Sequence, residues 1–549
     1  MGTKCGELPA ARGSAYGEVF TRRWVVDTIL DLVGYTADAN LAGLTIIEPA
    51  IGHGAFLLPI VDRLVSAATR LGIPFCELAD SIRSFDLQPH LVEMCRNSVY
   101  DYLVTNGCEA RIASTLIKNW IQHGDYLLDD IPTKADFIVG NPPYIRMDDL
   151  DPAALQKYRK KWMTMTGRCD IYVPFIERSL ALLKPSGRLG YICADRWMHN
   201  SYGAKLREHI TKSHSIDAIW RMHDVDAFER KVSAYPAIFI ASSRPQGKTV
   251  VIETTETFGK LDAPAATAFT QGTEVAKKQG NWTGRRFNKW YSGSDFWPAG
   301  NTDAMDILTQ LSLSHQLLDD GGFTRISIGV ATGADDAYIV SPKTDVEQDR
   351  LLPIVMSQDI RTGKLTIPTK VMINPWSHSG DLVNLKEYPK MTRFLASHPA
   401  VSERFVARKN PTTWYRTIDR VYPGIAERPK LLLQDMKQSI TPVLDPGGYY
   451  PHHNLYYIVS DVWDMEVLGG LLLSKIAEAF VSAYCVRMRG GTLRFQAQYL
   501  RKIRVPRPDE IDGEVAEALR EAFRNGDREG ATFAAARAYG IRAELFLGA

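Results

Sequence analysis

Residues 135–144 read Ala-Asp-Phe-Ile-Val-Gly-Asn-Pro-Pro-Tyr, an apolar run that ends abruptly in a polar and proline-rich turn. The run 135–140 is short and contains a β-branched pair, which is typical of a buried strand. The two prolines remove two backbone donors and fix φ, so neither a helix nor a sheet ladder continues through them. The stretch therefore predicts a strand whose carboxyl end holds the amide of Asn141 and the ring of Tyr144 in place.

The position of this turn at the end of a strand indicates a ligand site. Open α/β sheets bind their ligands at the carboxyl ends of the strands. A rigid amide beside an aromatic face suits a planar group that carries an amino substituent, such as a nucleobase. A plain strand-ending turn is the alternative for an isolated Pro-Pro pair, so the upstream sequence has to decide between the two.

The length and composition of the chain set broad limits. Its 549 residues are too many for one ordinary core and predict two or three domains. The 45% hydrophobic and 23% charged residues are typical of a soluble globular protein. The net charge is only +2, but residues 401–507 carry 16 Lys and Arg against nine Asp and Glu. A surface that faces a polyanion needs such an excess, and a solvated face explains it nearly as well.

The seven cysteines are scattered through the chain, with no CxxC pair and no histidine spacing that suits zinc. They are typical of reduced core thiols in a cytoplasmic protein, and we expect no metal. The N-terminus has no apolar signal segment, and no uninterrupted apolar run is long enough to span a bilayer. The sequence therefore predicts a cytoplasmic protein that does not act at a membrane.

The first 243 residues alternate predicted strands with predicted helices. Residues 44–48 form a predicted strand, 49–54 a tight glycine loop, and apolar positions between 60 and 71 recur at helical spacing. A second strand over 82–86 precedes a predicted helix over 89–102. This alternation predicts an α/β fold with a doubly wound, mostly parallel, Rossmann-like sheet.

Acidic residues and glycines follow these strands. Glu48 ends the first strand and Asp86 ends the second, where a carboxylate can bridge two ribose hydroxyls. Gly52 and Gly54 let a ligand approach the backbone of the loop closely. The dinucleotide fingerprint GxGxxG and the P-loop Gly-Lys-Ser/Thr are both absent from the sequence. The pattern therefore favours a nucleoside ligand without phosphates.

Taken in this order, the elements resemble the class I S-adenosylmethionine-dependent methyltransferases, and more narrowly the γ-class DNA adenine-N6 methyltransferases of restriction–modification systems. Residues 48–56, Glu-Pro-Ala-Ile-Gly-His-Gly-Ala-Phe, are similar to the family loop Asp-Pro-Ala-Cys-Gly-x-Gly-x-Phe. Residues 16–21, Tyr-Gly-Glu-Val-Phe-Thr, resemble the segment that closes over the methionine end of the cofactor, although Arg22 stands where the family usually has Pro. Gly124-Asp125 resembles the pair whose acid binds the cofactor adenine.

The resemblance implies S-adenosyl-L-methionine as the methyl donor and S-adenosyl-L-homocysteine as the product. The cofactor-binding residues that it implies are Phe20, Thr21, Glu48, Ala50, Gly52, Gly54, Asp86, Asp125 and Asn141.

The tetrapeptide at the end of the predicted strand matches the catalytic motif of the family without departure. The resemblance therefore implies that the catalytic residues are Asn141, Pro142, Pro143 and Tyr144. Residues 228–234, Phe-Glu-Arg-Lys-Val-Ser-Ala, are similar to the family segment whose Phe stacks on a flipped-out adenine. The resemblance therefore implies that Tyr144 stacks on one face of the flipped-out base and Phe228 on the other. A core Phe at the sheet edge is the alternative, with Tyr235 as the next candidate for stacking.

Beyond residue 300 the chain resembles the C-terminal specificity domain of the same group. Residues 328–339 are similar to its Gly-x-x-Thr-Gly-x-Asn-x-Ala-Phe element, and 352–360 to its Pro…Gly-Arg-Asp-Ile segment, with Gln358 in place of Arg. We therefore expect a catalytic domain over 1–243, a linker over 244–300, a mixed α+β target-recognition domain over 301–510 and a helical tail over 511–549.

Two basic segments of the C-terminal half are candidates for contact with nucleic acid. Tryptophans and basic residues interleave between 282 and 297, and either line a DNA cleft or pack within a connecting segment. The densest basic stretch flanks Gly490-Gly491, and we favour phosphate contact there over a solvated face. The predicted DNA-binding residues are Arg487, Arg489, Arg494, Arg501 and Lys502.

These observations predict an enzyme that methylates the N6 amino group of a flipped-out adenine in double-stranded DNA. We expect it to act as a monomer on DNA, with a separately encoded restriction endonuclease as a partner. The alternatives are a protein-glutamine or RNA N-methyltransferase, N4-cytosine methylation, and a non-catalytic DNA-binding specificity subunit.

Overall fold

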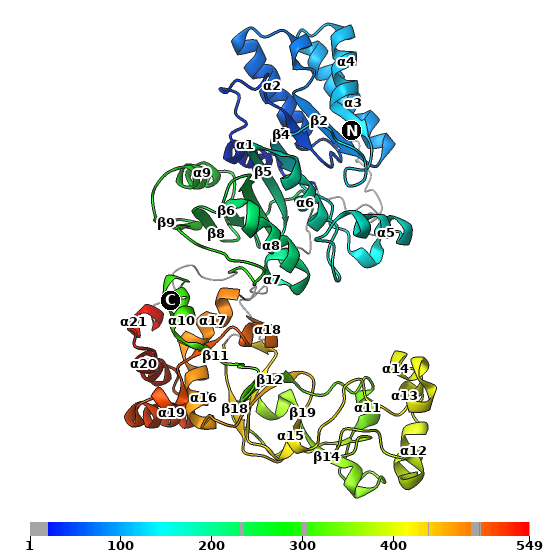
Figure 1. Ribbon diagram of the computed structural model, residues 1–549, viewed down its shortest axis with the longest axis vertical. Helices are drawn as coiled ribbons and strands as arrows, with labels where there is room; N and C mark the ends of the chain where they lie inside the picture. Colours follow the sequence, from blue (N-terminus) through cyan, green and yellow to red (C-terminus); the bar gives the residue numbers. More distant parts are fainter. Residues whose placement is uncertain are drawn as a thin grey trace, which may run out of the picture. The chain divides into compact units, whose positions relative to one another are not determined.

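A computed structural model describes residues 20–230, 235–298, 305–437, 439–484, 493–494 and 496–547 (Figure 1). The chain divides into two compact units, Met1–Pro298 and Ala299–Ala549.

A ten-stranded sheet organises the first unit. Its strands in chain order are β1 (Ile46–Glu48), β2 (Ile82–Asp86), β3 (Ile121–His123), β4 (Ala135–Gly140), β5 (Leu183–Ala194), β6 (Ser215–Arg221), β7 (Pro236–Ser242), β8 (Thr249–Thr254), β9 (Ala276–Gln279) and β10 (Trp282–Phe287). They lie in the order β3-β2-β1-β4-β5-β7-β6-β8-β10-β9. The first five are parallel, and β7 runs antiparallel between β5 and β6. This sheet confirms the predicted doubly wound, mostly parallel fold.

Helices flank this sheet (Figure 1). They are α1 (Arg23–Val33), α2 (Leu57–Leu71), α3 (Pro89–Thr105), α4 (Ala110–Trp120), α5 (Pro152–Lys161), α6 (Tyr172–Leu182), α7 (Arg196–His199), α8 (Ala204–Ser213) and α9 (Ala263–Gln271). α2 buries its apolar face, including Ile60, Val61 and Leu64, in the core of the unit. α3 begins with Pro89 at a position where the missing N–H costs no helical hydrogen bond.

The segment 244–298 corrects the predicted domain boundary. It is not a linker, because β8 pairs with β6 and β10 pairs with β8, so both extend the same sheet. The polar composition of the segment arises because β9 and β10 lie at the sheet edge, where one face meets solvent. Trp282, Trp290 and Trp297 are buried and therefore pack in the core rather than line a DNA cleft.

The second unit contains two four-stranded sheets. Its strands are β11 (Gln316–Leu317), β12 (Thr324–Ile328), β13 (Ile339–Val340), β14 (Leu351–Val355), β15 (Val371–Ile373), β16 (Lys430–Gln434), β17 (Met436–Lys437), β18 (Val443–Asp445), β19 (Tyr450–Pro451), β20 (Leu455–Ser460), β21 (Leu493–Arg494) and β22 (Arg504–Val505). One sheet has the order β12-β20-β16-β18 and the other β13-β15-β14-β19. Residues 452–454 pass directly from β19 in one sheet to β20 in the other.

The helices of the second unit complete a mixed α+β architecture. They are α10 (Met305–Ser314), α11 (Asp335–Tyr338), α12 (Pro389–Ala396), α13 (Pro399–Ser402), α14 (Phe405–Lys409), α15 (Gly424–Glu427), α16 (Met465–Leu473), α17 (Lys475–Tyr484), α18 (Ala497–Leu500), α19 (Gly513–Asn525), α20 (Arg528–Tyr539) and α21 (Glu544–Leu547). α16 and α19 approach closely, since a Cβ atom at Gly470 would lie 2.4 Å from the carbonyl oxygen of Leu519. The predicted helical tail is therefore packed into this unit.

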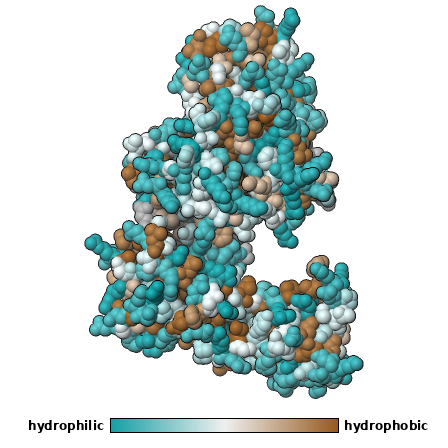
Figure 2. Space-filling view, viewed as in Figure 1, coloured by the Kyte–Doolittle hydropathy of each residue, from teal (hydrophilic) through white to brown (hydrophobic). Residues whose placement is uncertain are grey.

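Large apolar side chains lie mainly inside both units. On the face shown in Figure 2, hydrophilic residues predominate and apolar residues occur in scattered groups. Within the described residues no single helix is long and apolar enough to cross a bilayer, and one bent pair, α16 with α17, passes by length and composition only.

Candidate active site

The ends of four parallel strands bring the predicted site residues to one edge of the first sheet. Glu48 ends β1, Asp86 ends β2, Asp125 comes two residues after β3, and Asn141 follows β4 directly. Because β1 lies between β2 and β4, the loops after these strands are neighbours. They surround a cavity of about 1000 Å³ that opens to solvent. All the predicted cofactor residues except Gly54 line this cavity.

The glycine loop after β1 takes a shape that other residues rarely adopt. Gly52 and Gly54 have φ angles of 50° and 82°, and a Cβ atom at Gly54 would lie 3.3 Å from the sulfur of Cys95. Asp86 ties this loop to the next one, because its carboxylate accepts hydrogen bonds from the Gly52 N–H and the Gln88 N–H, both at 2.9 Å. A carboxylate has about four acceptor sites, so Asp86 can also accept a ligand hydroxyl.

Glu48 is the buried acid of the site, with 1% of its surface exposed. Burial, and then the neighbouring charge of Asp86, raise the pKa of this carboxyl well above its usual value. Its Oε2 atom is buried and has no hydrogen-bond partner among the residues that the structure describes. A ligand that brings an N–H or O–H donor to this oxygen would offset the cost of burying it. S-adenosylmethionine carries N–H and O–H donors, so the cavity around Glu48 fits this cofactor.

Asp125 is held by the polypeptide on both of its oxygens. Oδ1 accepts a hydrogen bond from the Leu127 N–H, and Oδ2 accepts one from the hydroxyl of Tyr158, each at 2.8 Å. Tyr158 lies on α5, is buried and lines the cavity. Burial and the charge of Asp125 raise the pKa of Tyr158. Tyr158 was not among the residues predicted from the sequence, because it lies 33 residues from Asp125 in a helix of otherwise polar character.

The N-terminal segment reaches the side-chain amide of Asn141. The Asn141 Nδ2 group donates a hydrogen bond to Thr21 Oγ1 at 3.1 Å. Thr21 is held there because the strand-like residues around it pair with residues 227–229, through Arg22 N–H to Ala227 O and Glu229 N–H to Phe20 O. Since Nδ2 points at Thr21, the amide oxygen of Asn141 lies on the opposite side. The preceding residues 16–19 of the predicted cofactor segment lie outside the described residues.

The two predicted stacking rings are close but perpendicular. The ring centroids of Tyr144 and Phe228 are 6.5 Å apart and the ring planes meet at 83°. Phe228 is 5% exposed, and the ring centroid of Tyr172 lies 6.3 Å from that of Tyr144. The structure therefore places Phe228 beside the Asn141–Tyr144 turn, and a planar ligand fits between the two ring faces only if one ring rotates. Residues 231–234 of this segment lie outside the described residues.

A buried acid next to Tyr144 is a feature that sequence reasoning missed. Asp195 follows β5 directly, is 1% exposed, and accepts a hydrogen bond from His223 Nε2 at 2.6 Å. His199 Nε2 lies 3.6 Å from the same oxygen. Burial alone would raise the pKa of Asp195, but the two histidines outweigh it and hold the pKa below its usual value. Burial, followed by the charges of Cys193 and Asp195, raises the pKa of Tyr144 well above its usual value.

The structure describes only part of the predicted DNA-binding stretch. Arg501 donates hydrogen bonds to Asp319 Oδ2 at 2.8 Å and to the Ile326 carbonyl at 2.7 Å, so its guanidinium supports the second unit. The Lys502 amine lies 5.9 Å from the centre of the Tyr484 ring. Arg487 and Arg489 lie outside the described residues, as does the side chain of Arg494 in β21.

The order β3-β2-β1-β4-β5-β7-β6, with β7 antiparallel and a glycine loop after β1, defines a class I methyltransferase. Residues 80–228 match the family model of the Eco57I restriction-modification methylase. The chain is 41% identical over 543 residues to the Type II methyltransferase M.PaeR7I of Pseudomonas aeruginosa, which covers 96% of this chain and 92% of the relative. It is 39% identical over 536 residues to the Type II methyltransferase M.XhoI of Xanthomonas vasicola. This match covers 96% of this chain and 97% of the relative.

A solved structure gives the same fold. The Type IIL restriction-modification enzyme MmeI in complex with DNA matches with a TM-score of 0.59 at 12% identity, over 94% of this chain and 74% of that one. The chain belongs to the type II methyltransferases of restriction–modification systems. The predicted family and fold class are thereby confirmed.

Proposed function

We propose that this enzyme transfers a methyl group from S-adenosylmethionine to the N6 amino group of an adenine that is flipped out of double-stranded DNA. The observation that carries the proposal is the position of the Asn141–Tyr144 turn. The turn follows β4 directly and borders the cavity formed by the loops after β1 to β4. Its position supports an acceptor site for a planar amine beside the methyl donor.

We assign the cofactor to the cavity after β1, β2 and β3. Glu48 and Asp86 would accept hydrogen bonds from the methionine and ribose parts, and Asp125 from the adenine amine. The ring of Phe20 packs against the ring of His53 in the glycine loop, with the two centroids 4.6 Å apart. When bound, S-adenosylmethionine supplies an electrophilic methyl group on a sulfonium centre.

Asn141 and Pro142 would act on the target amine. The lone pair of an exocyclic adenine amine is delocalised into the ring, so the amine is a poor nucleophile. The Asn141 side-chain oxygen and the Pro142 carbonyl would accept its two hydrogens, draw the nitrogen toward tetrahedral geometry and stabilise the positive charge that develops on it. The two prolines and the hydrogen bond to Thr21 keep these acceptors from relaxing away.

Tyr144 and Phe228 would hold the extruded base. Flipping a base from a duplex costs a few kcal/mol. Stacking on an aromatic face contributes roughly 1–3 kcal/mol, so two faces offset this cost. Because the two rings lie edge to face here, we infer that one of them rotates when the base enters.

The experiment offers labelled S-adenosylmethionine to the purified protein together with duplex DNA, RNA or protein. We expect label in DNA only, and nucleoside digestion followed by mass spectrometry to identify N6-methyladenine. The Asn141→Ala variant is the control and should transfer no label. N4-methylcytosine, labelled RNA, labelled protein glutamine, or no transfer at all would each overturn the proposal.

We infer the cellular context from the family. A modification enzyme of this class would act on cytoplasmic DNA beside a separately encoded restriction endonuclease, and one monomer suffices for one target base. The transfer needs no metal, because the sulfonium carries its own activation.

A further inference from the structure

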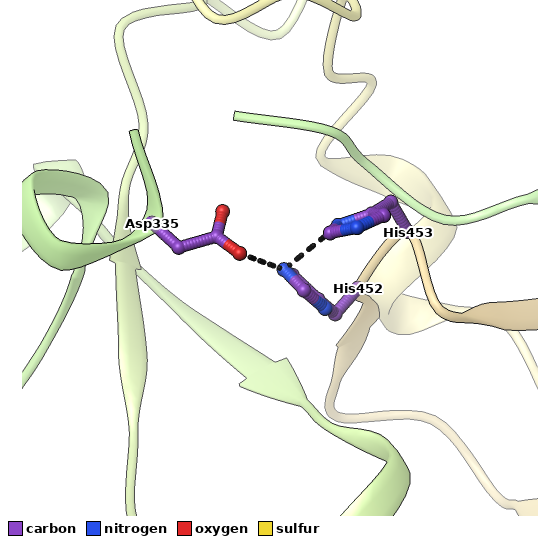
Figure 3. Close-up of side chains that lie close together, drawn as sticks. All are labelled: Asp335, His452 and His453. Atoms are coloured by element: carbon purple, nitrogen blue, oxygen red, sulfur yellow. Dashed lines mark hydrogen bonds and ion pairs between the residues drawn. The ribbon is translucent and has the colours of Figure 1, made fainter. Parts of the chain in front are cut away.

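Three side chains of the second unit converge in a cluster that takes no part in the candidate active site of the first unit (Figure 3). Nε2 of His452 lies 3.0 Å from Oδ2 of Asp335 and 3.0 Å from Nδ1 of His453. His452 is 2% exposed, whereas His453 faces solvent and the Asp335 side chain is 42% exposed. The three candidate ligand atoms all lie within 4.8 Å of one another. The cluster is therefore buried on one side and open on the other.

The Nε2 atom of His452 has two polar neighbours, the carboxylate of Asp335 and Nδ1 of His453. Nδ1 of His452 lies 2.8 Å from the side-chain oxygen of Asn454, and donation to that oxygen places the ring proton on Nδ1. Nε2 of a neutral ring then presents its lone pair to the carboxylate of Asp335, which is also an acceptor. A proton on Nε2 would form a hydrogen bond with either Asp335 or His453, but not with both. One cation between the three atoms attracts all of them.

Neighbouring polar groups orient two of these side chains. The buried hydroxyl of Thr332 donates a hydrogen bond to the other carboxylate oxygen of Asp335. Asn454 contacts the Nδ1 side of His452, so a neutral ring that donates to Asn454 keeps its Nε2 lone pair available for a metal ion. Metal-binding histidines and carboxylates characteristically have such supporting hydrogen bonds on the side away from the metal.

We propose that Asp335, His452 and His453 bind a zinc ion. Two imidazoles and one carboxylate suit zinc, and three protein ligands leave the fourth tetrahedral position for water on the open side. Tetrahedral bonds of about 2.0–2.1 Å place neighbouring ligand atoms roughly 3.3 Å apart. The observed contacts of 3.0 Å need only a small opening to reach that spacing.

The position of the cluster indicates a structural role for the ion. His452 and His453 lie between β19 of one sheet and β20 of the other, and Asp335 lies on the connection from β12 to β13. The backbone already joins these segments, since His453 N–H donates to the Val330 carbonyl at 3.0 Å. The ion would add a second link between the two sheets. Asp335 and His452 are 117 residues apart, so the spacing rules behind our expectation of no metal could not detect the site.

The test measures zinc uptake by the full chain after removal of its affinity tag and treatment with EDTA. Equilibrium dialysis with metal analysis should give one bound zinc per chain, and Co²⁺ in its place should show the visible absorption of a tetrahedral ion. Zinc should raise the Tm and EDTA should reverse the increase. Uptake is measured without methyl transfer, so the result is independent of the proposed function.

Three variants and two controls locate the site. Asp335→Asn and His453→Gln should abolish stoichiometric uptake, and Thr332→Val should weaken it by roughly 10–100-fold. Asp336→Asn and His378→Gln, which alter an exposed carboxylate and an exposed histidine of the same unit, are the matched controls and should bind as wild type does. Because His453 is exposed, His453→Gln should fold normally, which circular dichroism checks. Absence of zinc from the wild type, or unchanged uptake by His453→Gln and Asp335→Asn, would overturn the proposal.

Discussion

Replacing Glu48 by Gln should stabilise the cofactor-free protein while weakening its affinity for the cofactor. Glu48 is 1% exposed, and one of its oxygens has no hydrogen-bond partner among the described residues. A buried polar atom left unsatisfied costs about 1–3 kcal/mol, and more when it is charged. An amide has nearly the same shape, carries no charge and can donate toward Asp86. We therefore expect the free energy of unfolding to rise by about 1–3 kcal/mol, or roughly 2–4 °C in Tm per kcal/mol.

The stability that Glu48→Gln gains over the wild type should increase as the pH rises. Burial and, second, the charge of Asp86 raise the pKa of Glu48 in the folded state well above 4.5, the usual value for a Glu carboxyl. Below pH 4.5 the side chain is neutral in both the folded and the unfolded state, so the wild type and the variant should be equally stable. As pH rises from 4.5 to the folded-state pKa, the unfolded wild type releases its proton before the folded wild type does. The wild type therefore loses stability relative to the variant across this window.

Thermal unfolding from pH 5 to 8.5 tests the stability, and calorimetric titration with S-adenosylhomocysteine tests the binding. Loss of a hydrogen bond to a charged group costs about 1.5–3 kcal/mol, so the variant should bind roughly 10–100-fold more weakly. Glu77→Gln, at an exposed position of the same unit, is the matched control and should change neither quantity. A Glu48→Gln protein that is less stable than the wild type at pH 8, or has the same pH profile, would refute the reasoning.

Substitutions at four further positions test separate roles. Asn141→Ala should lower kcat by at least roughly 10²–10³-fold while calorimetry shows cofactor affinity largely intact; retained turnover would rule out the proposed acceptor. Thr21→Val removes the hydroxyl that orients the Asn141 amide, so kcat should fall by about 2–10-fold with KM for DNA unchanged, and Thr21→Ser should restore it. Phe228→Ala should weaken capture of the target base, read as fluorescence of 2-aminopurine at the target position; unchanged fluorescence and rate would leave Phe228 a core residue. Arg501→Ala should lower the Tm without changing the salt dependence of DNA affinity, because Arg501 bonds to Asp319; a slope reduced by about one would instead indicate a phosphate contact.

The sequence was informative wherever a feature depends on residues that are close along the chain. The strand before Asn141 ends where the two prolines prohibit its continuation, and α3 begins at the predicted Pro89. Gly52 and Gly54 adopt the positive φ angles for which glycine is suited. These features follow from local sterics and from apolar periodicity, which act within a few residues.

Features that depend on distant partners could not be predicted from the sequence. Residues 244–298 have the composition of a linker, yet they form β8 and β10, because an edge strand needs only one apolar face. Arg501 bonds to Asp319, which lies 182 residues away, while its predicted DNA contact stays a prediction. In both cases the structure shows a partner that is distant in the sequence and that local patterns do not reveal.

By itself, the sequence determined the alternation of strands and helices before residue 243, the rigid turn at Asn141–Tyr144 and the acidic residues and glycines that we propose for the methyl donor. Only the tertiary structure decided that Tyr158 bonds to Asp125 and that Asp195 lies beside Tyr144. It also brought Asp335 to His452. The physical reason is that local conformation depends on a few neighbouring residues, whereas these contacts depend on how the sheets fold back and place the ends of separate strands together.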